Sequence, residues 1–190
     1  MFKTFYPDTC AKSTYEIDFE AYYEKGYRAI IFDIDNTLVE HGVKADDRCI
    51  ALFERLKKIG YSTMLLSNNK EPRVKSFFEQ VQAVGYIYKG GKPSTKNYIR
   101  AMERMGSEKA TTLFVGDQLF TDVWGAKRAG IFAILARYST FILAVTHDNC
   151  DSFLRNHGNN ALRTNRGTET ASEATAGIYV CDTVLHTYSI

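Results

Sequence analysis

The sequence has few cysteines, and they lie far apart. Its 190 residues contain four of them, none in a CxxC pair: Cys10, Cys49, Cys150 and Cys181. A structural zinc site needs paired ligands, and the disulfide framework of a small secreted domain needs denser spacing. We therefore expect reduced thiols, as in a cytoplasmic protein.

The sequence also lacks an excess of charge of either sign. Lys and Arg together number 24 and Asp and Glu number 22, so the formal net charge is +2. Because proteins that bind nucleic-acid phosphates usually carry a strong basic excess, we expect no nucleic-acid partner. The hydrophobic content of 45% is enough for a real core and excludes disorder of the whole chain.

No segment has the pattern of a membrane span. Residues 1–18 contain no long apolar run, so we do not expect a secretory signal. The most apolar stretch, residues 131–145, is interrupted by Arg137 and is shorter than the roughly 20 residues that a helix needs to cross a bilayer. These absences favour a soluble, cytoplasmic protein.

Short apolar runs alternate with helical patterns from Arg28 onward. Strands are expected at five runs: 29–32, 63–66, 86–88, 112–115 and 132–135. Helices are expected around Cys49 to Leu56 ending at Gly60, around Val74 to Val81 ending at Gly85, around Tyr98 to Met105 before Gly106, and at 121–129. The nearly all-apolar strands predict an α/β fold, a Rossmann-like, doubly wound parallel sheet covered on both faces.

The chain divides by composition into two parts. Residues 1–137 include the alternating pattern and are expected to form one domain. Residues 138–190 are expected to be a C-terminal extension of unknown function. It is predicted to be partly flexible because its middle, residues 156–177, is rich in Asn, Thr, Ser and Gly.

Two carboxylates follow the first strong strand. Alternation along a strand places Asp33 and Asp35 on the same side, with Ile34 facing away. Two carboxylates so close repel each other, and a divalent cation offsets that repulsion. Since Mg²⁺ prefers oxygen ligands, the pair predicts a magnesium site.

Other polar groups follow the later strands of the predicted sheet. They are Ser67 and Asn68 after the second strand, Lys92 after the third, and Asp117 with Asp122 after the fourth. Parallel sheets bind ligands beyond the carboxyl ends of their strands, so these groups are expected to converge. Taken alone, Ser67 and Asn68 could cap a helix, Lys92 could be a surface lysine, and Asp122 could equally cap its own helix. Together they suit phosphoryl transfer through an aspartyl-phosphate.

The segments DIDNT, SNN, GGKP and GDQLFTD, in this order, resemble the four motifs of the haloacid dehalogenase superfamily. They are most similar to its subfamily IIIA phosphatases, the YqeG-like branch that includes phosphatidylglycerophosphate phosphatases. The resemblance extends from about Phe5 to Leu135. It implies a Mg²⁺-dependent phosphatase that hydrolyses phosphomonoesters through an aspartyl-phosphate.

The resemblance also implies a role for each motif residue. Asp33 is expected to be the nucleophile and Asp35 the general acid and base, while Thr37 shapes the turn after them. Mg²⁺ is expected to bind Asp33, the main-chain carbonyl of Asp35, and Asp117. The remaining roles are phosphate binding by Ser67 and Asn68, charge stabilisation by Lys92, and support of the metal or the lysine by Asp122.

Neither gap between motifs is long enough for a cap domain. Asp33 to Ser67 holds one loop, one helix and one strand, and Ser67 to Lys92 holds one helix and one short strand. An uncapped site admits a phosphate on a large molecule or on a membrane surface. By resemblance, we expect the substrate to be phosphatidylglycerophosphate or another lipid phosphate, with peripheral membrane contact. The fallback is a phosphoprotein or a nucleic-acid end. The alternatives are a receiver-like phospho-accepting signalling module and an inactive scaffold of the same fold; the oligomeric state is left open.

Overall fold

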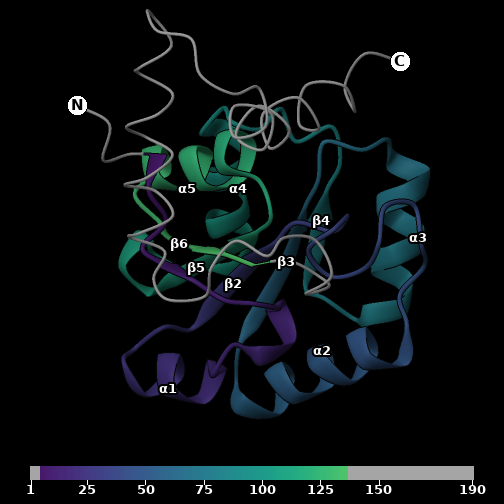
Figure 1. Ribbon diagram of the computed structural model, residues 1–190, viewed down its shortest axis with the longest axis horizontal. Helices are drawn as coiled ribbons and strands as arrows, with labels where there is room; N and C mark the ends of the chain where they lie inside the picture. Colours follow the sequence, from purple (N-terminus) through teal and green to yellow (C-terminus); the bar gives the residue numbers. More distant parts are fainter. Residues whose placement is uncertain (1–4, 137–190) are drawn as a thin grey trace, which may run out of the picture. The chain divides into compact units, whose positions relative to one another are not determined.

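A single parallel sheet organises the described part of the chain. The protein is represented by a computed structural model that describes residues 5–136 (Figure 1). The sheet has six strands in the order β1-β6-β5-β2-β3-β4, and all the neighbouring strands run parallel. The strands are β1 Thr9–Cys10, β2 Ala29–Phe32, β3 Ser62–Leu66, β4 Gly85–Ile87, β5 Thr112–Gly116 and β6 Phe132–Leu135.

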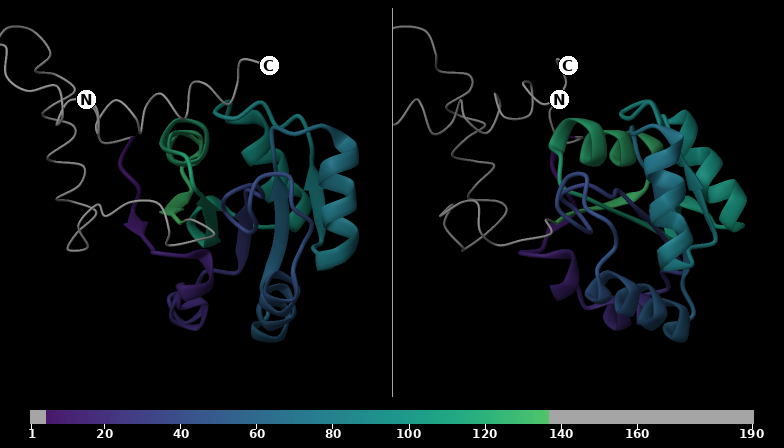
Figure 2. Two further views of the ribbon diagram at one scale, coloured as in Figure 1. Left: turned by 45° about the vertical axis from the view of Figure 1, so that its right-hand side comes forward. Right: turned by 90° about the vertical axis from the view of Figure 1, so that its right-hand side faces the viewer.

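Helices cover both faces of this sheet. They are α1 Phe19–Glu24, α2 Asp47–Ile59, α3 Glu71–Val81, α4 Lys96–Met105 and α5 Trp124–Ala129. The buried side chains of α1, α2 and α3 share one hydrophobic cluster, and those of α4 and α5 share a second cluster on the opposite face. Figure 1 and Figure 2 show α1 and α2 on one side of the sheet and α4 and α5 on the other. The predicted doubly wound α/β fold is therefore confirmed.

Local signals in the sequence explain where α2 begins and ends. The Asp46 side chain accepts a hydrogen bond from the main-chain N–H of Cys49 at 2.7 Å, which caps the first turn. The helix ends at Gly60, whose φ of 109° is a left-handed conformation that favours glycine. The predicted face from Cys49 to Leu56 is buried against the sheet.

Two predicted helix boundaries are wrong. Helix α3 ends before Gln82, which takes the left-handed conformation with φ 54°, whereas Gly85 starts β4. The helix predicted at 121–129 is preceded by a π-helical turn at Leu119–Val123, and only α5 is a regular α-helix. Periodicity did not indicate either feature, because one left-handed residue or one wide turn leaves the spacing of apolar residues almost unchanged.

The N-terminal segment contributes structure that the sequence pattern did not predict. Strand β1 is two residues long, too short to show alternation, and it pairs with β6 at the edge of the sheet. Of the cysteines in the described range, Cys49 is a buried free thiol, as expected. Cys10 is disulfide-bonded, which contradicts the expectation of reduced thiols.

The segments between the motif residues contain no cap domain. From Asp33 to Ser67 the chain forms a loop, α2 and β3, and from Ser67 to Lys92 it forms α3 and β4. Within residues 5–136, no helix is both long enough and apolar enough to cross a membrane. The extension predicted at 138–190 lies outside the described residues.

Candidate active site

The sheet register brings the motif residues to one edge. Phe32, the last residue of β2, pairs with Leu65 of β3 on one side and with Val115 of β5 on the other. The three strands therefore end at nearly the same level, so the residues that follow them are neighbours. Asp33 continues the ladder, because its main-chain N–H donates to the carbonyl of Val115 at 3.0 Å.

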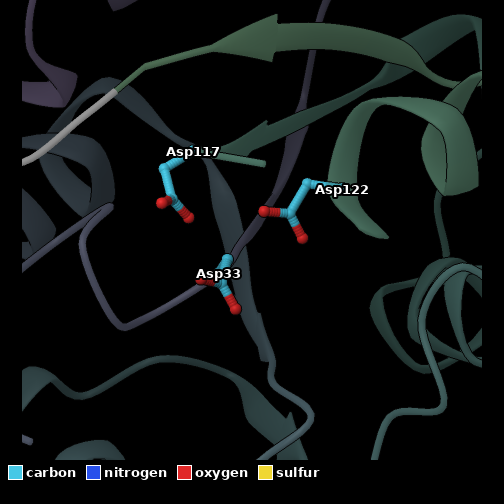
Figure 3. A group of neighbouring side chains, drawn as sticks. All are labelled: Asp33, Asp117 and Asp122. Atoms are coloured by element: carbon cyan, nitrogen blue, oxygen red, sulfur yellow. The ribbon is translucent and has the colours of Figure 1, made fainter. Parts of the chain in front are cut away.

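Three carboxyl groups converge at this edge. Asp33, Asp117 and Asp122 each offer an oxygen, and these oxygens lie within 4.8 Å of one another (Figure 3). Asp33 is 7% exposed and Asp122 is 1% exposed. We call these three residues the acidic triad.

Lys92 joins two members of the triad. Its Nζ donates to Oδ1 of Asp33 at 2.5 Å and to Oδ1 of Asp122 at 2.6 Å, and its side chain is buried. The main chain of Lys92 is fixed by Asn68, whose Oδ1 accepts from the Lys92 N–H at 2.8 Å and whose Nδ2 donates to the Lys92 carbonyl at 3.3 Å. The lysine is therefore held at both its main chain and its ammonium group.

The charges in this site shift the pKa values of Asp33 and Lys92. Burial raises the pKa of Asp33 to about 7; the ammonium of Lys92 opposes this effect, and the carboxylates of Asp122 and Asp35 add to it. Burial alone would lower the pKa of Lys92, but the carboxylates of Asp122 and Asp33 outweigh it, so the pKa of Lys92 is raised. The lysine stays protonated at neutral pH and holds two acidic side chains together.

A π-helical turn and a glycine place Asp122. In the turn at Leu119–Val123, the N–H of Val123 bonds the carbonyl of Gln118 five residues earlier, and such turns are frequent at functional sites. A Cβ on Gly116 would meet Cγ and Oδ2 of Asp122 at 2.6 Å. Gly116 is therefore needed for the close approach of Asp122 to the end of β5.

The Asp35 carboxylate is held by donors from three residues, and its expected sharing of a cation with Asp33 stays a prediction. Its Oδ1 accepts from the N–H of Gly42 at 2.8 Å and from Nη2 of Arg73 at 2.9 Å, and its Oδ2 accepts from Nδ2 of Asn69. Strand β2 ends at Phe32, so alternation along a strand does not by itself fix the direction of the Asp35 side chain. The contact of a metal with the main-chain carbonyl of Asp35 stays a prediction.

Ser67 and Thr37 lie close to the carboxylates. Ser67 is 2% exposed, and its Oγ accepts from the N–H of Asn69 at 3.2 Å and from Asn69 Nδ2 at 3.1 Å, which leaves the hydroxyl hydrogen able to donate. The Thr37 hydroxyl lies 3.5 Å from Asp33 Oδ2 and 3.4 Å from Asp117 Oδ1. The Asn68 side chain bonds Lys92, so its contact with a phosphoryl group stays a prediction.

Arg73 and Asn69 are site residues that sequence reasoning missed. Both contact the Asp35 carboxylate; Asn69 is the last residue of the SNN motif, and Arg73 lies in the first turn of α3. The first turn of a helix that follows a site strand is a place where such residues can be sought. Nothing in the spacing alone distinguishes Arg73 from Lys75, the other cationic residue of α3.

The acidic triad has the chemistry of a divalent-cation site. Lys92 pairs with two of the three carboxyl groups, Asp33 and Asp122, and a cation bound between all three would reduce the repulsion among them. Carboxylate oxygens are the ligands that Mg²⁺ prefers. The residues present therefore fit a divalent metal ion.

Comparisons with known proteins agree with this geometry. Residues 41–130 match the family of haloacid dehalogenase-like hydrolases. The chain is 41% identical over 134 residues to "Probable phosphatase YqeG" of Bacillus subtilis, an alignment that covers 70% of this chain and 77% of that protein.

Two solved structures have the same fold. One is a haloacid dehalogenase phosphatase from Thermococcus onnurineus, with TM-score 0.52 and 16% identity over 69% of this chain and 98% of that chain. The other is a hydrolase of the same superfamily from Ehrlichia chaffeensis, with TM-score 0.50 and 19% identity over 71% of this chain and 97% of that chain.

The substitution Gly116→Ala is expected to disturb the site through Asp122. The added Cβ displaces the Asp122 carboxyl group and weakens its bond to Lys92, so kcat/KM for p-nitrophenyl phosphate should fall by about tenfold to a hundredfold. The matched control is Gly85→Ala, because its new Cβ meets only the flexible end of Met64 at 3.0 Å. Equal activity of the two variants would show that the close approach of Asp122 is not needed.

Protons are expected to compete with Mg²⁺ for Asp33. Because the pKa of Asp33 is raised to about 7, its carboxyl is mostly protonated below that pH in the metal-free protein. The affinity for Mg²⁺ should therefore fall by up to about tenfold per unit as the pH drops below 7, and should level off above it. Calorimetric titration with MgCl₂ measures this, with Asp8→Asn, outside the triad, as the control. An affinity that does not change between about pH 5.5 and pH 7 would contradict the expectation.

Proposed function

This chain belongs to the haloacid dehalogenase-like hydrolases and is a phosphatase similar to YqeG, and from that premise we propose that it hydrolyses phosphomonoesters through an aspartyl-phosphate on Asp33. The observation that carries the proposal is the ion-pair arrangement of the site. A buried ammonium contacts Asp33 and Asp122, and the triad gathers around the same point.

In the first step, a carboxylate oxygen of Asp33 attacks phosphorus. The new O–P bond forms as the bond between phosphorus and the ester oxygen breaks, and Asp35 gives its proton to the leaving alcohol. In the second step, water attacks phosphorus and gives a proton to Asp35. The O–P bond to Asp33 breaks, and inorganic phosphate leaves.

The remaining residues stabilise negative charge during both steps. The Lys92 ammonium lies beside Asp33, and the Ser67 hydroxyl is able to donate a hydrogen bond to a phosphoryl oxygen. Asp33, Asp117 and the main-chain carbonyl of Asp35 are the proposed Mg²⁺ ligands, and Asp122 holds Lys92. When bound, Mg²⁺ supplies further neutralisation of charge on the phosphoryl oxygens.

The substrate proposed here is a phosphate on a large or membrane-borne molecule. The support is the absence of a cap domain between Asp33 and Lys92, since an uncapped site excludes water poorly around a small metabolite. Phosphatidylglycerophosphate is the first candidate substrate. With this substrate, the enzyme would act at the cytoplasmic surface of a membrane. The alternative of a receiver-like signalling module lacks support, because the relatives are phosphatases.

Asp33→Asn and Asp35→Asn are expected to fail at different steps. Asp33→Asn removes the nucleophile, so hydrolysis of p-nitrophenyl phosphate with Mg²⁺ should fall at least about a thousandfold with no phosphoenzyme. Asp35→Asn leaves the nucleophile, and because p-nitrophenolate needs no proton to leave, a phosphoenzyme should accumulate. Intact-mass spectrometry after a rapid acid quench measures the phosphoenzyme. If Asp33→Asn hydrolysed the substrate at the wild-type rate, Asp33 would not be the nucleophile.

The uncapped site is expected to prefer a large substrate. In mixed micelles, kcat/KM for phosphatidylglycerophosphate should exceed that for glucose phosphate or AMP by about tenfold or more, since contacts outside the phosphate add to transition-state binding. Release of inorganic phosphate is the readout, and a soluble glycerol phosphate is the control for the headgroup alone. Faster hydrolysis of the sugar phosphate or the nucleotide would contradict this substrate class.

A further inference from the structure

Within residues 5–136, the groups that bond the Asp35 carboxylate are hydrogen-bond donors from a main chain and two side chains. Gly42 N–H and Arg73 Nη2 donate to Oδ1, Asn69 Nδ2 donates to Oδ2, and Nδ1 of the exposed His41 lies 3.9 Å from Oδ1. These surroundings differ from those of the acidic triad, where three carboxyl groups lie close together. The surroundings of Asp35 are therefore less negative than those of the acidic triad.

Arg73 is only partly engaged by this arrangement. It lies in the first turn of α3, where its guanidinium carbon is 5.4 Å from the centre of the Phe77 ring. One hydrogen bond joins it to Asp35, and its Nε is buried without a hydrogen-bond partner in the part of the chain that the structure describes. An unpartnered buried donor is unfavourable, and such groups in native proteins call for a functional explanation.

Arg73 lies close to the position that the leaving group is expected to occupy. On the proposed mechanism, Asp35 gives its proton to the ester oxygen of the leaving alcohol, so that alcohol lies beside Asp35 in the reacting complex. Arg73 is within hydrogen-bond distance of Asp35, and its side chain is 20% exposed. Atoms of the leaving group close to the ester oxygen therefore come within reach of the guanidinium.

We propose that Arg73 binds an oxyanion carried by the leaving group, so that this phosphatase prefers phosphomonoesters whose alcohol bears a second anionic group. This inference rests on the proposed function, because Asp35 marks the leaving-group side only if it is the general acid. A guanidinium presents planar pairs of N–H donors that match a carboxylate or a phosphodiester. Asp35 keeps its bonds to Gly42 and Asn69 when Arg73 turns toward such an oxyanion.

The test compares substrates that differ in one charge. The first pair is phosphoglycolate and hydroxyethyl phosphate, which carry a carboxylate and an alcohol at the same position. The second pair is glycerol phosphate with and without a methyl phosphodiester. In the wild-type protein with Mg²⁺, kcat/KM should be at least about tenfold higher for the anionic member of a pair. The carboxylate pair and the phosphodiester pair distinguish which oxyanion is bound.

Removal of the guanidinium should abolish this preference. In Arg73→Gln, kcat/KM should fall by at least about tenfold more for the anionic member of a pair than for the neutral member, whose own smaller fall reports the lost contact with Asp35. Arg73→Lys should restore part of the preference, because an ammonium keeps the charge but not the paired donors. Lys75→Gln is the matched control, since it removes an exposed cation of the same helix two residues away, on a different side.

Two results would overturn the inference. One is a wild-type protein that treats both members of each pair alike, and the other is an Arg73→Gln variant that loses activity equally on both, which would show that Arg73 only holds Asp35. Calorimetric binding of phosphoglycolate to Asp33→Asn, with and without Arg73→Gln, measures the contact without turnover, and equal affinities would also contradict it. Turnover by Asp33→Asn alone would instead refute the proposed function, so the two failures are distinguishable.

Discussion

The buried ion pairs of Lys92 are the interaction on which the site depends. One ammonium holds Asp33 at the end of β2 and Asp122 beyond the end of β5, two carboxyl groups that would otherwise repel each other. Asn68 fixes the lysine main chain, and the absence of a Cβ at Gly116 lets Asp122 approach. Loss of either ion pair leaves a buried carboxylate without its cation, and loss of the contacts that position Lys92 or Asp122 weakens both pairs, so a single substitution at this edge is expected to affect the whole site.

The fold places different chemistry on the two sides of Asp33. On one side, the strand end and π-helical turn after β5 bring Asp117 and Asp122 to the triad. On the other side, the first turn of α3 brings Arg73 to Asp35. Charge that would attract a cation is thus separated from donors that would meet a leaving group, within one edge of a parallel sheet. Such edges are where ligands bind in doubly wound folds.

The sequence predicted most of the sheet and the motif residues because both depend on local patterns. Apolar runs located five strands, and polar residues that follow four of these runs are Asp33, Ser67, Lys92 and Asp117. The surroundings of Asp35 could not be predicted, because they depend on how the loop after β2 turns and on the direction of α3. The close approach of Asp122 likewise depends on a π-helical turn, and helical periodicity does not reveal such a turn.

The most direct test of the central claim is whether Asp33 accepts a phosphoryl group at a site that Lys92 and a cation share. Beryllium trifluoride mimics a phosphoryl group on a carboxylate, and fluorine NMR detects it when bound. The account predicts bound resonances in the wild-type protein that require Mg²⁺ and that are lost in Asp33→Asn. Resonances that persist in Asp33→Asn, or a wild-type protein that binds no beryllium trifluoride in the presence of Mg²⁺, would contradict it.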